Sequence, residues 1–129
     1  MTVSRPAYAA GQLWRCAGRS PDETPTVLIN QVDQHPQGGQ IYHVTLDGLR
    51  LRNPRVPGGL TSRLPHVPII AQGLDASAPV FVGEQAPDPA FREGYALWKK
   101  DFDAQRAGSF GVSVAQVLDI IERGMNGRA

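Results

Sequence analysis

The sequence lacks several features that would assign a protein to a class. Cys16 is its only cysteine, so no disulfide can form within the chain, which fits a reducing compartment. No apolar run approaches the ~20 residues of a membrane-spanning helix, and the start of the chain lacks the apolar core of a signal peptide. We therefore expect a cytoplasmic protein that does not enter membranes.

Negative charge is missing from one long stretch of the chain. The formal net charge of +1 gives no overall attraction to nucleic acid or to anionic lipid. No acidic residue occurs between Gly48 and Leu74, and the only full charges in that stretch belong to arginines. Acids gather in the last third of the chain, at Glu84, Asp88, Glu93, Asp101, Asp103, Asp119 and Glu122. The chain is therefore close to neutral in net charge overall, but residues 48–74 carry only positive charge.

The composition is that of one ordinary globular domain. Hydrophobic residues make up 41% and charged residues 19% of the 129 positions, which excludes a disordered chain and suits a single core. No repeat, low-complexity tract or linker divides the chain. We expect one domain over residues 1–129, with flexible ends at 1–10 and 125–129.

Alternating and β-branched residues predict strands, mostly in the first half of the chain. The segment 40–46 is the clearest strand, because apolar side chains on one face alternate with residues on the other. Asp47 and Gly48 follow it and indicate either a hairpin or a bulge in one bent strand. Further extended segments are expected at 12–17, 26–32, 49–52 and 79–83.

Prolines and glycines dominate residues 53–68, which we expect to form a long loop. Four prolines and the Gly58 and Gly59 pair disfavour regular structure there. At about 16 residues this segment exceeds most connections, and loops of such length tend to be functional or mobile. A short helix is expected within residues 69–77.

Two helices are predicted in the second half, over about residues 89–107 and 114–123. Asp88 is a suitable N-cap for the first, and Ser113 opens a capping-box pattern for the second. Gly108 suits the end of the first helix. An aromatic stripe recurs along the first helix at helical spacing, at Phe91, Tyr95, Trp98 and Phe102.

Strands followed by helices predict an α+β fold. We expect a small antiparallel bent sheet or half-barrel of about four to five strands, with both helices covering its open face.

Several motifs resemble those of a family of small uncharacterised bacterial proteins. They are GxxW (11–14), IYHV (41–44), GLRLRNP (48–54), PGGL (57–60), LPHVP (64–68) and EGYxxW (93–98). The resemblance covers nearly the whole chain and implies one compact domain. Because the family has no assigned activity, the resemblance implies no catalytic residue.

The basic stretch is the candidate binding surface. Leu49 and Leu51 would face inward, so Arg50 and Arg52 would leave the same outer face. Guanidinium groups bind carboxylates and phosphates in bidentate fashion, and glycine lets backbone N–H groups approach an anion closely. The candidate binding residues are Arg50, Arg52, Asn53, Arg55, Gly58, Gly59, Arg63 and His66.

The three histidines, His35, His43 and His66, fit no metal-ligand spacing, so no metal site is expected. His43 and His66 could form a composite site with Asp47 if the long loop folds back over the strand. Cys16 with His43 as its base is a weaker idea, because no helix N-terminus follows the cysteine.

We therefore interpret the chain as a non-enzymatic binding or accessory module, without a cofactor, for an anionic protein surface. Two alternatives are open: single-stranded nucleic-acid binding by the basic sheet face, and a small enzyme acting on an anionic substrate with His66 as acid or base. The oligomeric state is left open.

Overall fold

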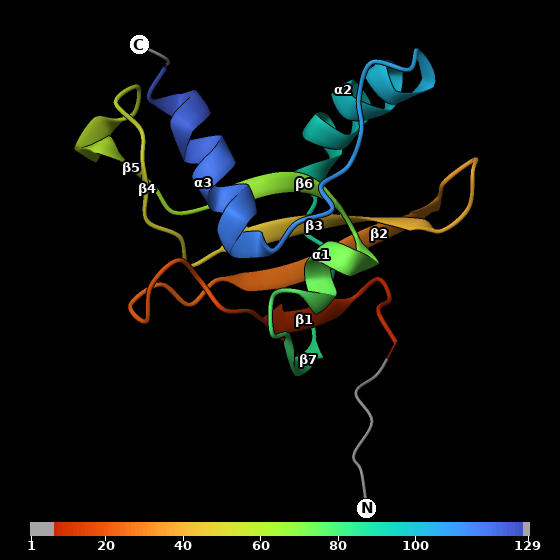
Figure 1. Cartoon of the computed structure of the whole chain (residues 1–129), viewed down its shortest axis with the longest axis horizontal. Coiled ribbons are helices and arrows are strands. Elements are labelled where there is room, and N and C mark those ends of the chain that lie inside the picture. Colours follow the sequence, from red (N-terminus) through yellow and green to blue (C-terminus); the bar gives the residue numbers. More distant parts are fainter. Residues whose placement is uncertain (1–6, 128–129) are drawn as a thin grey trace, which may run out of the picture.

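The computed structural model describes residues 7–127 and shows an α+β fold (Figure 1). A five-stranded antiparallel sheet, built mainly from the N-terminal part, packs against two C-terminal helices, as predicted. The elements are β1 (Gln12–Arg15), β2 (Thr26–Gln34), β3 (Gln40–Asp47), β4 (Leu51–Arg52), a 3-10 turn (Pro57–Gly59), β5 (Leu60–Thr61), β6 (Leu64–Ile70), α1 (Ala71–Asp75), β7 (Val80–Glu84), α2 (Phe91–Asp103) and α3 (Val114–Met125).

The main sheet is open. Its strand order is β6-β3-β2-β1-β7, and every neighbouring pair is antiparallel, so β6 and β7 form the two edges. Within the described residues the sheet is therefore not closed into a barrel. Gly48, with a φ of 72°, turns the chain out of β3, and β4 pairs with β5 in a separate two-stranded ribbon. Residues 49–52 thus neither form a hairpin with β3 nor continue it.

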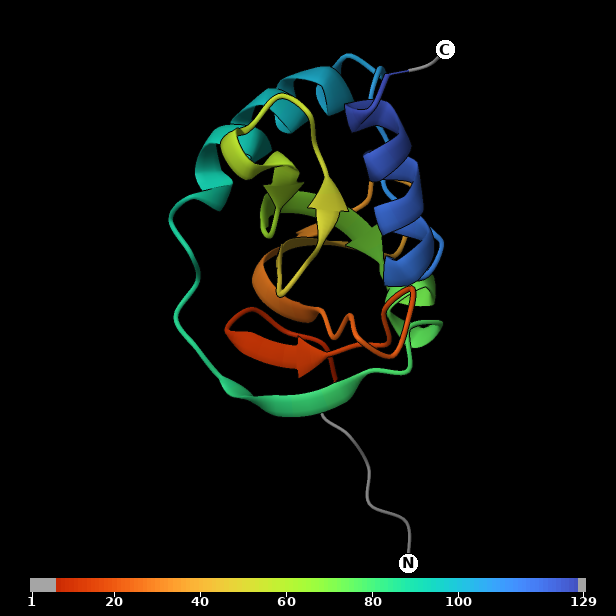
Figure 2. The same cartoon turned by 90° about the vertical axis from the view of Figure 1, so that its left-hand side faces the viewer.

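The two faces of the sheet pack against different helices. Val44 and Leu46 of β3 belong to the main core cluster, together with Val117 and Leu118 of α3. His43 points to the opposite face, because side chains alternate along a strand, and there the aromatic rings of α2 cover it. The expectation that both helices share one face is therefore wrong. The two helices stand apart in Figure 1, whereas in the turned view of Figure 2 the last turn of α2 lies near the C-terminal end of α3.

Part of the expected long loop is regular structure. β6 occupies Leu64–Ile70 even though Pro65 and Pro68 lie within it. An edge strand tolerates proline, because a missing N–H on the outer side breaks no ladder. Pro68 also contributes its carbonyl oxygen to a hydrogen bond from the Phe110 N–H, which extends the edge. The proline count therefore misled the prediction at this segment.

The predicted starts of the two helices lie closer to the observed starts than the predicted ends lie to the observed ends. The Gln116 N–H donates to the Ser113 hydroxyl at 3.3 Å, which confirms the capping box of α3. Asp88 accepts a hydrogen bond from the Ala90 N–H at 2.9 Å, but α2 begins only at Phe91. α2 ends before Gly108, and Gln105 instead adopts the positive φ of 62°.

Tyr8 packs near the start of the described chain, with its ring centroid 5.1 Å from that of Trp14. Residues 1–6 and 128–129 of the ends expected to be flexible lie outside the described residues. Between residues 7 and 127, no helix has both the length and the apolar character needed to span a bilayer.

Candidate functional site

Residues 48–63 form a small projecting ribbon, which we call the arm (Figure 1). Leu51 pairs with Thr61, and Arg52 pairs with Leu60. The turn between the two strands contains Gly58 and Gly59, with φ values of 82° and 74°, and these conformations favour glycine. Gly58 and Gly59, which were predicted as binding residues, therefore provide the backbone conformation of the turn.

The arm is anchored to α3 through its backbone. The Arg52 N–H donates to the Glu122 carboxylate at 2.6 Å, and the Asn126 side chain donates to the Arg52 carbonyl at 2.8 Å. Leu49 and Leu51 are buried in the main core, as predicted. The arm is thus attached on one side and exposed on the other.

All four predicted arginines are exposed, but Arg63 also forms ion pairs within the molecule. Of the other three, Arg50, Arg52 and Arg55, the Arg52 side chain retains 75% of its accessible surface. Arg52 also lies near Glu122, at 3.9 Å, a distance at which attraction to an exposed group is weak. These three guanidinium groups could meet an external anion.

The remaining predicted binding residues serve mostly internal contacts. Arg63 forms ion pairs with Asp47 and Asp88, so its charge is already balanced within the molecule. The Asn53 side chain donates to the Thr61 hydroxyl and accepts from the Arg55 N–H, which holds the turn. Because these side chains already have partners within the molecule, we leave Arg63 and Asn53 out of the set that we consider for binding an external anion.

A charged network that sequence reasoning missed lies at the base of the arm. Arg19 donates to Glu23 at 2.9 Å and to Glu122 at 2.8 Å, and it also reaches the Arg50 carbonyl at 3.3 Å. Glu23 is only 4% exposed and accepts from the Arg50 N–H at 3.4 Å. We call Arg19, Glu23 and Glu122 the arginine network. It connects the 18–25 loop, the arm and α3.

Electrostatics keep the arginine network ionised. Burial raises the pKa of Glu23, but its hydrogen bonds from Arg19 outweigh that effect and leave the pKa below its usual value. The Arg52 N–H, followed by Arg19, lowers the pKa of Glu122. The hydrogen bond to Glu23 raises the pKa of Arg19. All three groups are therefore charged at neutral pH.

A second cluster lies beneath α2, on the other face of the sheet. His43 Nδ1 is 2.9 Å from His66 Nε2, and the two rings are stacked with a 14° interplanar angle. His43 Nε2 is 3.2 Å from an Asp33 oxygen, which also accepts from the Tyr95 hydroxyl at 2.8 Å. We call His43, His66, Asp33 and Tyr95 the histidine network.

The acceptor at one end of the histidine network sets its proton positions. An ionised Asp33 can only accept, so His43 donates from Nε2 and its Nδ1 is an acceptor. His66 must then donate from Nε2, which leaves the His66 Nδ1 without a proton. The neutral state is thus a chain of hydrogen bonds from His66 through His43 to Asp33.

Burial favours the neutral imidazoles. Burial and then the neighbouring His43 lower the pKa of His66 from 6.5 to about 4. Burial also lowers the pKa of His43, although Asp33 opposes the shift. Burial raises the pKa of Asp33, but hydrogen bonds from Gln31 and Tyr95 outweigh it, and the net pKa is below its usual value.

The structure corrects the predicted composite histidine site. His43 and His66 do meet, as that hypothesis required, but their carboxylate is Asp33, while Asp47 pairs with Arg63. Within residues 7–127, no three His, Cys, Asp or Glu side chains are arranged to hold a metal ion. A Cβ added at Gly94 would come within 2.8 Å of the His66 Cβ, so α2 lies directly on the pair.

Cys16 belongs to the main core and is not part of the histidine network. It is buried in the main core, whereas His43 faces the other side of the sheet. Burial raises the pKa of the Cys16 thiol to about 11, which keeps it protonated and unreactive at neutral pH. The pairing of Cys16 with His43 is therefore wrong.

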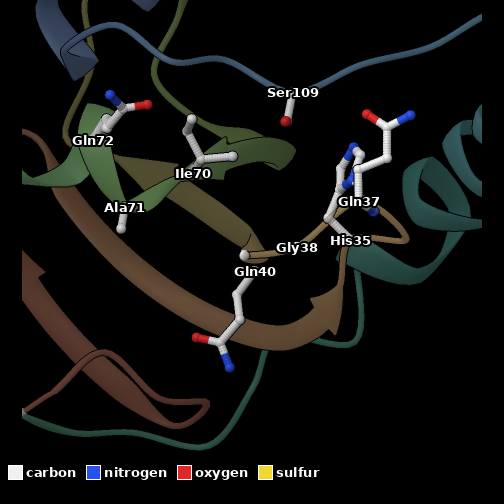
Figure 3. A pocket seen from close by; sticks show the side chains of 9 residues that line it. His35, Gln37, Gly38, Gln40, Ile70, Ala71, Gln72 and Ser109 are labelled. Carbon is white, nitrogen blue, oxygen red and sulfur yellow. Dashed lines mark hydrogen bonds between the residues drawn. The ribbon is translucent and has the colours of Figure 1, made fainter.

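A groove of about 470 Å³ lies beside the turn between β2 and β3 (Figure 3). Ser109 points into it, whereas Gln40 accepts a hydrogen bond from the Tyr42 hydroxyl. Its lining residues are His35, Gln37, Gly38, Gly39, Gln40, Ile70, Ala71, Gln72 and Ser109. Among its lining residues there is no Arg, Lys, Asp or Glu, and His35 is the one titratable side chain.

Comparisons of the chain with protein-family models, with curated proteins and with solved structures found no match. The resemblance to a family of small bacterial proteins therefore stays a prediction.

Proposed function

We propose that the protein is a binding module that uses its arm to engage an anionic protein surface. The observation that carries the proposal is the exposure of Arg50, Arg52 and Arg55 on a ribbon whose inner side is anchored to α3. Guanidinium groups held on an anchored backbone lose less freedom on binding a carboxylate than they would on a free loop.

Two further features support a protein partner over a nucleic acid. Leu60, in the same ribbon, is 52% exposed and offers apolar surface beside the charges. Tyr95 and Trp98 of α2, which could stack bases, instead pack on the sheet at His43 and His66. An acidic surface that also presents apolar side chains suits the arm best.

The test compares two variants with equal loss of charge. One replaces Arg50, Arg52 and Arg55 with Gln; the control replaces three arginines outside the arm, at Arg15, Arg92 and Arg106. A labelled polyglutamate peptide and a single-stranded oligothymidylate serve as defined probes, read by anisotropy at low ionic strength. Capture of acidic proteins from the native lysate follows with the same proteins.

We expect the arm variant to bind polyglutamate at least about tenfold more weakly, a loss of roughly 1.4 kcal/mol. The control should change binding by less than about twofold, and all three proteins should melt at similar temperatures. Equal losses in both variants would show that net charge alone matters and would remove the proposal. Preference for the oligonucleotide would favour the nucleic-acid alternative instead.

A further inference from the structure

Helix α2 is joined to the rest of the protein by two segments without helix or strand. Residues 85–90 connect it to β7, and residues 104–113 connect it to α3 apart from one bridge at Phe110. The N-terminal side is held by Asp88, whose N–H donates to Asn30 at 2.8 Å. In the described chain α2 takes no part in the pairing of the main sheet, so displacing this helix would leave the strand pairs intact.

The middle of α2 rests on the histidine network. The rings of Tyr95 and Trp98 both lie edge-on to His43, each with a centroid separation of 4.7 Å. Gly94 lies against His66, where only the absence of a side chain gives room. The Tyr95 hydroxyl donates to Asp33, which is the polar link between helix and sheet at this point. The middle of α2 thus contacts the histidine network, while Phe91 near its start is buried and Phe102 near its end contacts His35.

The hydrogen bonds of the histidine network limit how many protons it can accept. One added proton can be accepted at His66 Nδ1 without breaking the bond to His43, and the Asp33 carboxylate balances its charge. A second proton would occupy His43 Nδ1, the acceptor in that bond. Two imidazolium rings can only donate, so they would repel each other across 2.9 Å.

We propose that the histidine network is an acid-sensitive latch: it holds α2 on the sheet while at least one imidazole is neutral and releases the helix when both are protonated. This device is independent of the function proposed for the arm. Its release would uncover the aromatic side chains of α2 and the histidine-bearing face of the sheet.

The other charged and titratable groups around α2 have identifiable effects. Asp33 on β2 stabilises added positive charge, whereas Lys99 on α2 opposes protonation of His43. His35, from the turn after β2, contacts the far end of α2 through Phe102, with centroids 5.5 Å apart. Because His35 does not belong to the hydrogen-bonded chain of the histidine network, it provides the matched control.

Amide hydrogen exchange across a pH series tests the latch. Exchange of α2 amides is compared with that of β2 amides, both corrected for the intrinsic pH dependence of exchange. Between pH 7 and about 4, protection of α2 should fall by at least about tenfold while β2 stays protected, since release that requires two protons can scale by up to about a hundredfold per pH unit below the ordinary imidazole pKa.

His66→Gln keeps an N–H donor for His43 but removes the titrating ring, so its α2 protection should not fall over this pH range. His35→Gln should retain the wild-type acid response. Simultaneous loss of protection in α2 and β2 of the wild-type protein would overturn the latch, as would an unchanged acid response in His66→Gln. If the His66 variant does not fold, the comparison of amide exchange in α2 and β2 of the wild-type protein still tests the latch.

Discussion

The two polar networks lie on opposite sides of the same sheet and compensate for the burial of their polar groups in different ways. The arginine network keeps full charges and compensates the buried Glu23 with Arg19. The histidine network buries His43 completely, and burial keeps this imidazole neutral even though its contact with Asp33 favours the charged form. A compensated ion pair loses its strength only when a partner is removed or neutralised, whereas a neutral imidazole pair is disrupted by gaining charge.

The networks also hold different kinds of element. The arginine network fixes the base of the arm to α3, which is itself part of the main core. The histidine network fixes α2, which lies on the other face and is tethered by segments without regular structure. We therefore expect the arm to stay in place under conditions that release α2.

Among single substitutions in the two networks, Arg19→Met should have the largest effect. It leaves Glu23 buried without its cation, which costs about 3–5 kcal/mol in comparable buried pairs. Urea unfolding measures the loss. Lys99→Met is the control, because its ion pair with Asp103 is exposed to solvent and should contribute little to the free energy of unfolding. Similar losses in both variants would contradict the role given to Arg19.

Gly94→Ala tests the close contact of α2 with the histidine network. The added Cβ would lie 2.8 Å from the His66 Cβ, so α2 or β6 must shift, at a cost of about 1–3 kcal/mol. The gain in helix propensity, about 1 kcal/mol, offsets part of this cost.

The control for Gly94 is Gly124→Ala in α3, where a Cβ meets nothing within 4 Å. That change should be neutral or stabilising by up to about 1 kcal/mol, as read by thermal unfolding. If Gly94→Ala stabilises the protein as much as Gly124→Ala does, α2 does not lie as tightly on His66 as described.

Tyr95→Phe removes one hydrogen bond to the ionised Asp33 and leaves the ring contacts in place. We expect a loss of about 1–2 kcal/mol, because bonds to charged groups are stronger than neutral ones. Amide exchange should show the change mainly in α2, with little effect on α3. An equal loss of amide protection in α2 and α3 would contradict the separation of the two networks.

The smallest effect should come from Arg63→Gln, measured as polyglutamate binding. Arg63 already pairs with Asp47 and Asp88, so its loss should weaken binding of the probe by less than about twofold. Arg55→Gln, at an exposed position, should weaken it more. The reverse order would show that the internal pairs of Arg63 open on binding.

The sequence predicted those parts of the fold that local patterns determine. Alternation identified β3, and the Ser113 capping box identified the start of α3. The proline count at Pro65 and Pro68 failed because tolerance of proline depends on whether a strand lies at an edge, which is a property of the whole sheet.

The candidate site was predicted in part for similar reasons. Outward arginines follow from alternation, but the pairing of Arg63 with Asp88 depends on tertiary structure. Asp33 could have been found, because the turn after β2 sets a register that pairs Gln31 with His43 and so puts Asp33 on the same face. Arg19 and Glu122 are separated by 103 residues, and no local signal joins them.

The most direct test of the contrast between the networks is an NMR titration of the histidine ring protons. We predict that His43 and His66 both titrate below 6.5, with the pKa of His66 near 4, because burial disfavours their charged forms. Since these folded-state pKa values lie below the unfolded value, stability is complete above about pH 6.5 and declines as the pH falls toward 4. Titration of both rings at or above pH 6.5 would contradict a neutral network beneath α2.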